Sequence, residues 1–126
     1  MKNIFSKFWK ESKQPRKQRK YRYNAPLHIK RKFISVNLEK DLRETYGKRN
    51  VKVRVGDKVK VTAGQFKKRI GKVVRVDMKK LKLHIEGVEL TKRDGSKVTY
   101  PTDPSNVKIL ELDLTDKLRK KSIDRK

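Results

Sequence analysis

The chain has 126 residues, of which 41% are charged and 33% hydrophobic, and its formal net charge is +24 at pH 7. This length suffices for one domain with a modest core, and so much uncompensated positive charge favours a polyanionic partner, most simply a nucleic acid. Because the sequence contains no cysteine, disulfides, cysteine-ligated zinc and thiol catalysis are excluded.

Residues 1–23 are predicted to form a basic, disordered N-terminal tail. Ile4, Phe5, Phe8 and Trp9 are spaced like one stripe of a short helix, so this part either covers a partner surface or is unstructured. In residues 16–23, cations alternate with two tyrosines. The cations can neutralise phosphates while the phenol rings stack on bases. The alternative is that this segment is only a solubilising tail. We predict RNA contacts from Lys13, Arg16, Lys17, Arg19, Lys20, Tyr21, Arg22 and Tyr23.

Residues 24–50 are predicted to be a short helical segment that docks on the following domain. One helix is expected over residues 27–34, and a second after Asn37 as its N-cap, ending at Gly47. If Leu27 and Phe33 face the core, the cationic residues between them extend the RNA-binding surface. These further candidates are His28, Lys30, Arg31 and Lys32.

Residues 51–112 are predicted to form the main domain, because every valine except Val36 lies between Val51 and Val107. Alternating apolar and charged residues predict short strands, and Asp94-Gly95 predicts a two-residue hairpin turn. The expected strands cover residues 51–55, 58–62, 71–77, 81–86, 88–92, 97–100 and 106–112, and Pro101 and Pro104 are expected to end the sixth. Such strands are typical of a mainly β protein with a small closed or half-closed barrel.

The apolar sides of these strands supply the predicted core. Its members are Val59, Val61, Val74, Val76, Leu81, Leu83, Ile85, Val107 and Ile109. We also expect Phe66 to pack against the core rather than to stack on a base, since a lone aromatic beside a strand more often packs.

A glycine-bounded basic loop separates the second and third expected strands. Gly56-Asp57 opens a strand, and Gly64 and Gly71 bracket the loop, as glycine suits a turn with positive φ or a close backbone approach. This order resembles the KOW motif of ribosomal and transcription-elongation proteins, although a hairpin that merely folds is the simpler alternative. The loop adds a third cluster of predicted RNA-binding residues, Lys67, Lys68 and Arg69. Residues 113–126 are predicted to be a charged C-terminal tail, frayed or bound to a partner.

A more specific resemblance extends over residues 12–116. Segments 12–20, 23–28 and 100–107, together with Gly56-Asp57 and Glu86-Gly87-Val88, resemble the archaeal and eukaryotic form of the universal twenty-fourth protein of the large ribosomal subunit. The resemblance implies an SH3-like barrel that binds large-subunit rRNA early in assembly, lies near the mouth of the peptide exit tunnel, contacts neighbouring ribosomal proteins and catalyses nothing.

Two features depart from that family. A second glycine is usual inside the loop where this chain has Lys68, so either the turn is reshaped or Lys68 adopts a left-handed conformation. Residues 1–11 have no recognised counterpart.

Other functions are less well supported by the residues. A KOW-type transcription-elongation or ribosome-docking module would need a separate preceding domain, which the short basic N-terminal part cannot supply. The carboxylates Asp57, Asp77 and Asp94 lie in predicted turns without partners at catalytic spacing, and His28 and His84 lack carboxylates at ligand spacing. We therefore expect no enzyme, metal, cofactor or small-molecule substrate. Lacking a long apolar run or signal peptide, the chain is expected to be cytoplasmic and not membrane-bound.

Overall fold

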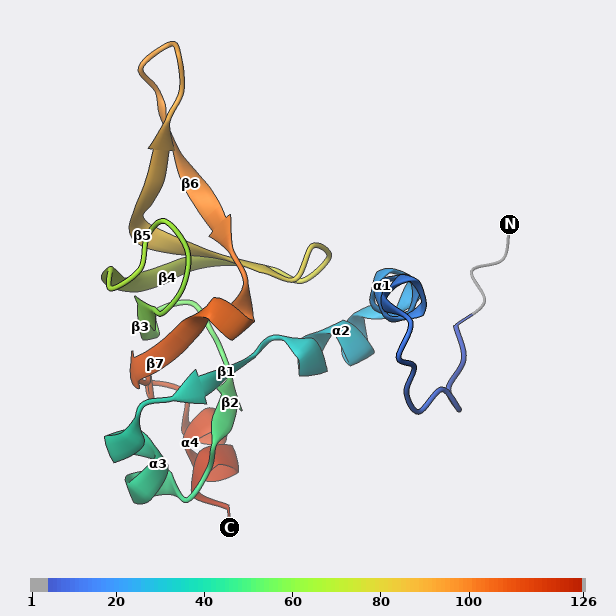
Figure 1. Ribbon diagram of the computed structural model, residues 1–126. Helices are drawn as coiled ribbons and strands as arrows, with labels where there is room; N and C mark the ends of the chain where they lie inside the picture. Colours follow the sequence, from blue (N-terminus) through green and yellow to red (C-terminus); the bar gives the residue numbers. More distant parts are fainter. Residues whose placement is uncertain (1–4, 126) are drawn as a thin grey trace.

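The computed structural model describes residues 5–125, which form a mainly β fold with helices at both ends (Figure 1). The mainly β class predicted from the sequence is therefore confirmed. In chain order the elements are α1 (Pro15–Asn24), α2 (Leu27–Phe33), β1 (Ser35–Leu38), α3 (Lys40–Tyr46), β2 (Asn50–Lys52), β3 (Lys58–Val61), β4 (Ile70–Asp77), β5 (Lys82–Thr91), β6 (Lys97–Thr102), the 3₁₀ turn η1 (Pro104–Asn106), β7 (Val107–Glu111) and α4 (Lys117–Asp124).

The strands form one mixed sheet of seven strands in the order β2-β1-β7-β3-β4-β5-β6. Neighbouring strands are antiparallel except for β1 and β7, which are parallel. The two edge strands, β2 and β6, do not pair with each other, so the hydrogen bonds do not close the sheet into a barrel. Residues 24–50 contribute a sheet strand, β1, that the sequence did not predict.

Strand β4 connects the two halves of the sheet because it pairs with a different strand at each end. Its first residues pair with β3 and its later residues with β5, and the pairing register shifts between Val73 and Arg75. This irregularity reverses the expected alternation: Val73 is buried, whereas Val74, which we predicted to be in the core, is 55% exposed. The prediction for Val74 was wrong because strict alternation cannot anticipate a bulge. Val76 is half-buried and packs against the core.

The core otherwise agrees with the sequence analysis. Phe66 is buried and belongs to the core cluster, so its predicted packing role is confirmed. The predicted members that are buried are Val59, Val61, Leu81, Leu83, Ile85, Val107 and Ile109. The same cluster also contains Val36 and Leu38 of β1, Val88 of β5, and Ile34 and Val53.

Each end of the chain contains a helix, where we expected a disordered N-terminal tail and a frayed or partner-bound C-terminal tail. Helix α1 begins with Pro15 at its first turn and continues through straight-chain Lys, Arg and Gln residues, which lose little rotamer freedom in a helix. It ends at Asn24 because Pro26 disfavours helical backbone at Ala25. Helix α4 begins after Asp116, whose carboxylate accepts a hydrogen bond from the Leu118 backbone. The segment 1–23, predicted to be a disordered tail, thus contains a helix, and so does the charged tail 113–126.

Three further predictions need refinement. The helix over residues 27–34 is confirmed as α2, but Asn37 lies in β1, and the second helix, α3, begins after Glu39. Gly47 does end α3 in a left-handed conformation. Pro101 does not end β6 but lies within it, opposite His84. Because β6 is an edge strand, the missing N–H of Pro101 leaves no inner ladder unpaired.

Helix α4 is fastened to the sheet by a buried ion pair. Both nitrogens at the end of Arg119 contact the Asp57 carboxylate, at 2.6 and 2.7 Å, and the side chains are 5% and 0% exposed. The same carboxylate accepts hydrogen bonds from the backbone N–H groups of Arg54 and Asp113. The Gly56-Asp57 turn is thus the point where the C-terminal segment joins the domain.

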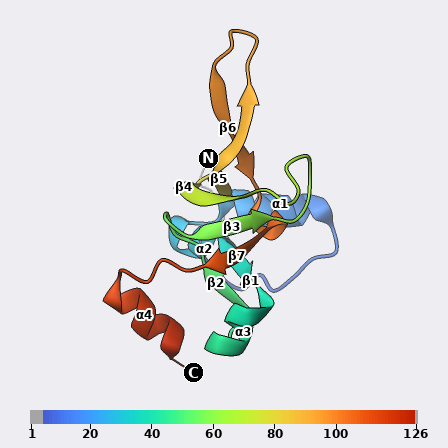
Figure 2. The same ribbon diagram turned by 90° about the vertical axis from the view of Figure 1, so that its left-hand side faces the viewer.

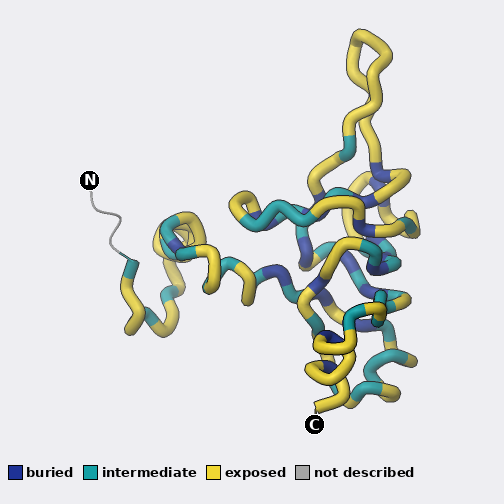
Figure 3. Tube along the Cα trace, turned by 180° about the vertical axis from the view of Figure 1, so that it is seen from behind, coloured by how far each residue is buried: buried dark blue, intermediate teal, exposed yellow. Residues whose placement is uncertain are grey.

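The hairpin of β5 and β6 projects well beyond the body of the molecule (Figure 2), with its Asp94-Gly95 turn at the tip. Its outer part is exposed, as is most of α1, while the buried residues gather where the strands cross (Figure 3). The register Glu89↔Thr99, Leu90↔Val98 and Thr91↔Lys97 confirms the predicted hairpin. The predicted two-residue turn was wrong, because residues 92–96 separate the two strands.

Candidate nucleic-acid interface

Helix α1 stands apart from the sheet and carries seven of the fifteen predicted RNA-binding residues (Figure 1). It is connected to the sheet through α2: the Arg22 guanidinium lies 5.8 Å from the centre of the Phe33 ring, and Phe33 packs against the core. Of all the RNA-binding candidates, only Tyr21 and Lys30 are half-buried, and the others are exposed. The helix therefore displays its cations to solvent from a defined position.

The turn between β4 and β5 lies close to α1 and adds cations that the sequence analysis did not single out. Lys30 of α2 donates from its Nζ to the carbonyl oxygen of Lys79, at 3.3 Å. A groove of about 430 Å³ lies between the helix and the turn. We call it the basic groove; it is lined by Arg19, Arg22, Tyr23, Lys79, Lys80, Leu81, Lys82 and Asp103.

Two carboxylates shape this groove. Asp77 accepts hydrogen bonds from the backbone N–H groups of Lys80 and Lys79, each at 2.9 Å, and these bonds hold the pKa of Asp77 below its ordinary value. The ionised carboxylate therefore fixes the turn that presents the two lysines. Asp103 pairs with Lys82 at 2.8 Å, so the excess positive charge of the groove comes from its four other cations, Arg19, Arg22, Lys79 and Lys80.

The two tyrosines predicted to stack on bases have different surroundings. The ring of Tyr21 is stacked with Trp9 at a centroid distance of 4.2 Å and contacts Phe5 at 5.0 Å, so the chain itself covers it. Tyr23, by contrast, is 81% exposed, and the Nζ of Lys30 lies 6.0 Å from its ring centre. Tyr23 is thus the aromatic residue of the basic groove that is available to an incoming base.

The cations of α2 spread around that short helix rather than forming one patch. The prediction for this cluster required both Leu27 and Phe33 to face the core. Phe33 does pack against the core, but Leu27 is 54% exposed. Lys30 joins α1 at the basic groove, whereas Arg31 lines a separate pocket with residues of β2 and α4. His28 and Lys32 are exposed.

The predicted cluster Lys67, Lys68 and Arg69 lies away from the basic groove. Its loop precedes β4, and the turn with Lys79 follows β4, so the two are separated by a strand roughly 20 Å long. Arg69 donates to the Gly87 carbonyl oxygen at 2.6 Å and lies 5.3 Å from the Phe66 ring, so its guanidinium is partly engaged within the protein. Lys68 has φ of 72°, which confirms the left-handed alternative.

The three motif glycines have the conformations or contacts for which glycine was expected. Gly56 and Gly64 have φ of 95° and 89°. Gly71 has no positive φ, but a Cβ there would lie 2.2 Å from the carbonyl oxygen of Glu86, so a side chain would collide with β5.

Within residues 5–125 there is no helix with the length and apolar character needed to cross a bilayer. In the same part of the chain, no three His, Cys, Asp or Glu side chains come together as metal ligands would.

The fold and the surface thus define a small, strongly basic β protein with cationic helices attached to its sheet. The chain belongs to the family of ribosomal proteins described as L26 in eukaryotes and L24 in archaea, whose model matches residues 12–126. This confirms the resemblance seen in the sequence. It assigns the chain to the large ribosomal subunit as a structural constituent and not as an enzyme.

The sequence analysis missed Lys79 and Lys80. Two adjacent lysines between two predicted strands were a visible signal, because a turn exposes its side chains. Their position beside α1 could not be predicted from the neighbouring residues, because it depends on how α2 and β4 pack in the folded protein.

Proposed function

We propose that this protein binds large-subunit rRNA through the basic groove, with Tyr23 as a stacking platform. The cations of α1 and of the β4–β5 turn line one groove although they are about sixty residues apart in sequence. That convergence of cations from distant segments is the observation on which the proposal depends. Exposed cations neutralise phosphates, and a neighbouring exposed ring can stack on an unpaired base.

The resemblance adds three finer parts to the proposal. They are binding early in assembly of the subunit, a place near the polypeptide exit tunnel in the cytoplasmic ribosome, and an SH3-like barrel of the half-closed kind. The family match supports this ribosomal role over the alternative of a transcription-elongation module.

Contacts with neighbouring ribosomal proteins are also part of the proposal. Leu90 and Val98 face each other across the projecting hairpin and are 41% and 43% exposed, and nearby Tyr100 is 39% exposed. An apolar strip on an arm that extends from the body is a surface that a partner would cover.

The test compares two triple variants that remove the same charge. The groove variant carries Arg19→Gln, Lys79→Gln and Lys80→Gln, and the control carries Lys120→Gln, Lys121→Gln and Arg125→Gln on or next to α4. Binding to a structured large-subunit rRNA fragment is measured over a range of salt concentrations. The groove variant should lower the slope of log affinity against log salt by about 2 to 3, at roughly 0.7 to 0.9 per lost phosphate contact.

The control variant should bind nearly as well as the natural chain. Equal weakening of both variants would mean that net charge alone drives binding, and an unchanged groove variant would contradict the proposed site. Sedimentation of the tagged protein with large subunits and their precursors in a sucrose gradient tests the assignment to the subunit independently.

A further inference from the structure

The N-terminal segment before the family-matched residues folds back on α1 and builds an aromatic cluster there. Trp9 stacks on Tyr21 at 4.2 Å with an interplanar angle of 21°, and Phe5 contacts the same ring at 5.0 Å. Tyr21 also meets Phe33 edge-on at 6.2 Å. Phe5 and Trp9 thus have a specific packing partner, although they lie outside residues 12–126.

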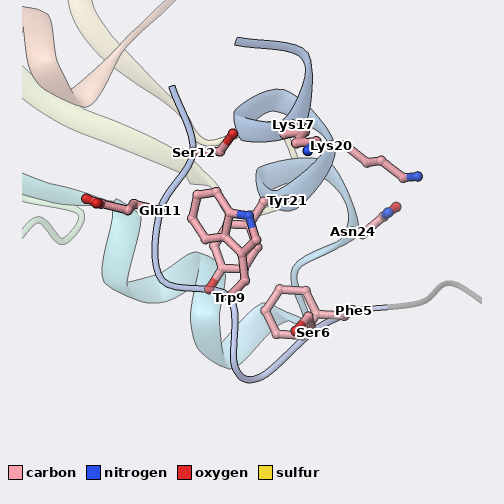
Figure 4. Close-up of a pocket in the computed structure, with 9 residues that line it drawn as sticks. All are labelled: Phe5, Ser6, Trp9, Glu11, Ser12, Lys17, Lys20, Tyr21 and Asn24. Atoms are coloured by element: carbon pink, nitrogen blue, oxygen red, sulfur yellow. The ribbon is translucent and has the colours of Figure 1, made fainter. Parts of the chain in front are cut away.

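A pocket of about 420 Å³ lies within this cluster (Figure 4). Phe5, Trp9 and Tyr21 supply its aromatic walls. Lys17, Tyr21 and Asn24 are spaced by four and three residues along α1, which places them on one face of the helix. The volume is in the range of sites that hold a small ligand, typically about 300 to 1,000 Å³.

The rim of the pocket is cationic and polar. Lys17 and Lys20 come from α1, and Ser12 and Asn24 add groups that can hydrogen-bond to the edge of a base. Glu11 is the one acidic residue of the lining, and its side chain points away from the aromatic stack in Figure 4. Aromatic walls beside cations are the combination that holds single-stranded nucleic acid, with bases on the rings and phosphates on the lysines.

We infer that this pocket binds an unpaired nucleotide of RNA, whose base extends the aromatic stack of Phe5, Trp9 and Tyr21 and whose phosphates contact Lys17 and Lys20. The inference rests on the proposed RNA-binding function and adds a second site. The basic groove offers a base only the single exposed ring of Tyr23, whereas this pocket offers a cluster of three aromatic rings.

The sequence supplies its own reporter. Trp9 is the only tryptophan in the chain, so tryptophan fluorescence, excited selectively over that of the tyrosines, comes from the wall of the pocket. The probe is a single-stranded oligoadenylate of six nucleotides, titrated into the full-length protein. An oligonucleotide with the same phosphates but without bases is titrated in parallel. We expect saturable quenching by the oligoadenylate only.

Two matched variants locate the effect. Phe5→Ala removes a wall of the pocket, and Phe8→Ala removes the same side chain from the same segment at a position that is 92% exposed and does not line it. Phe5→Ala should weaken oligoadenylate binding by about 5-fold or more, because stacking on one aromatic contributes roughly 1 to 3 kcal/mol. Phe8→Ala should leave the affinity unchanged.

A third variant excludes a simple loss of structure. Phe5→Leu keeps an apolar side chain against Tyr21, and circular dichroism reports whether α1 remains helical. With the helix intact, Phe5→Leu should still weaken binding. The inference is overturned if the base-free oligonucleotide quenches equally, if Phe5→Ala and Phe8→Ala bind alike, or if oligoadenylate gives no quenching. If these results occur while structured rRNA still binds, the proposed function stands and only the pocket is wrong.

Discussion

Lys68 shows how one residue can conflict with its local conformation. It has φ of 72°, and its backbone N–H donates to the Val61 carbonyl oxygen at 2.8 Å, so the turn is held in place by β3. A left-handed conformation costs a side-chain-bearing residue roughly 1 to 2 kcal/mol, which glycine avoids. The loop keeps a cation here at the expense of stability.

We predict that Lys68→Gly is more stable than Lys67→Gly by about 1 to 2 kcal/mol. Both variants lose one cation and gain one flexible glycine, so the difference isolates the left-handed conformation, which Lys67 does not have. Chemical denaturation of the two proteins measures it. Equal free energies of unfolding would show that the turn carries no such strain.

Helix α4 depends on tertiary contact rather than on its own sequence. It has eight residues, and isolated helices of that length are marginal in water. Ile123 is buried, Arg119 pairs with Asp57, and Arg54 pairs with Asp116 at 2.5 Å. The Arg54 pair is exposed and contributes little, so the buried pair and Ile123 are the main anchors.

Arg119→Met should destabilise the protein by about 3 to 5 kcal/mol, because it leaves the Asp57 carboxylate buried without its cation. The control Lys120→Met replaces the adjacent exposed cation of the same helix and should change stability by no more than about 0.5 kcal/mol. Urea unfolding followed by circular dichroism measures both. Similar values for the two variants would mean that the ion pair does not hold α4.

Over the whole molecule, repulsion between the many positive charges destabilises the compact folded state. A net charge of +24 on 15.0 kDa repels itself in the compact state. Many of the exposed cations lie on α1 and on the turns around the sheet rather than opposite carboxylates. Binding of a polyanion would relieve this repulsion, and small counterions relieve it in part.

Added salt should therefore raise the thermal stability of the free protein and lower its affinity for rRNA. Raising NaCl from about 0.01 M to about 0.15 M shortens the screening length from about 30 to about 8 Å, so the Tm of the RNA-free protein should rise. Affinity for structured rRNA, measured in the same buffers, should fall because each counterion released on binding gains less entropy at higher salt. A Tm that falls over this range would show that self-repulsion does not limit stability.

Local sequence patterns predicted a large part of the fold and of the site. Alternation placed β3, β5 and β7 and most core residues, the Asp94-Gly95 pair placed the projecting hairpin, and charge located the exposed cations of α1. The site was predicted less completely. Tyr21, predicted to stack on a base, is covered by Trp9. Lys79 lies beside α1 only in the folded protein, so its place in the groove could not be predicted from its sequence neighbours.

Composition, alternation and turn residues were enough to predict a mainly β, strongly basic protein, because these signals act over a few neighbours. The ribosomal family was indicated separately, by the resemblance of several segments of the sequence. The three-dimensional packing was needed to show that the bulge buries Val73 in place of Val74, that both ends contain helices, and which cations share the basic groove. The reason is physical: register shifts, helix docking and the meeting of distant side chains depend on packing between segments far apart in the chain, which no local pattern records.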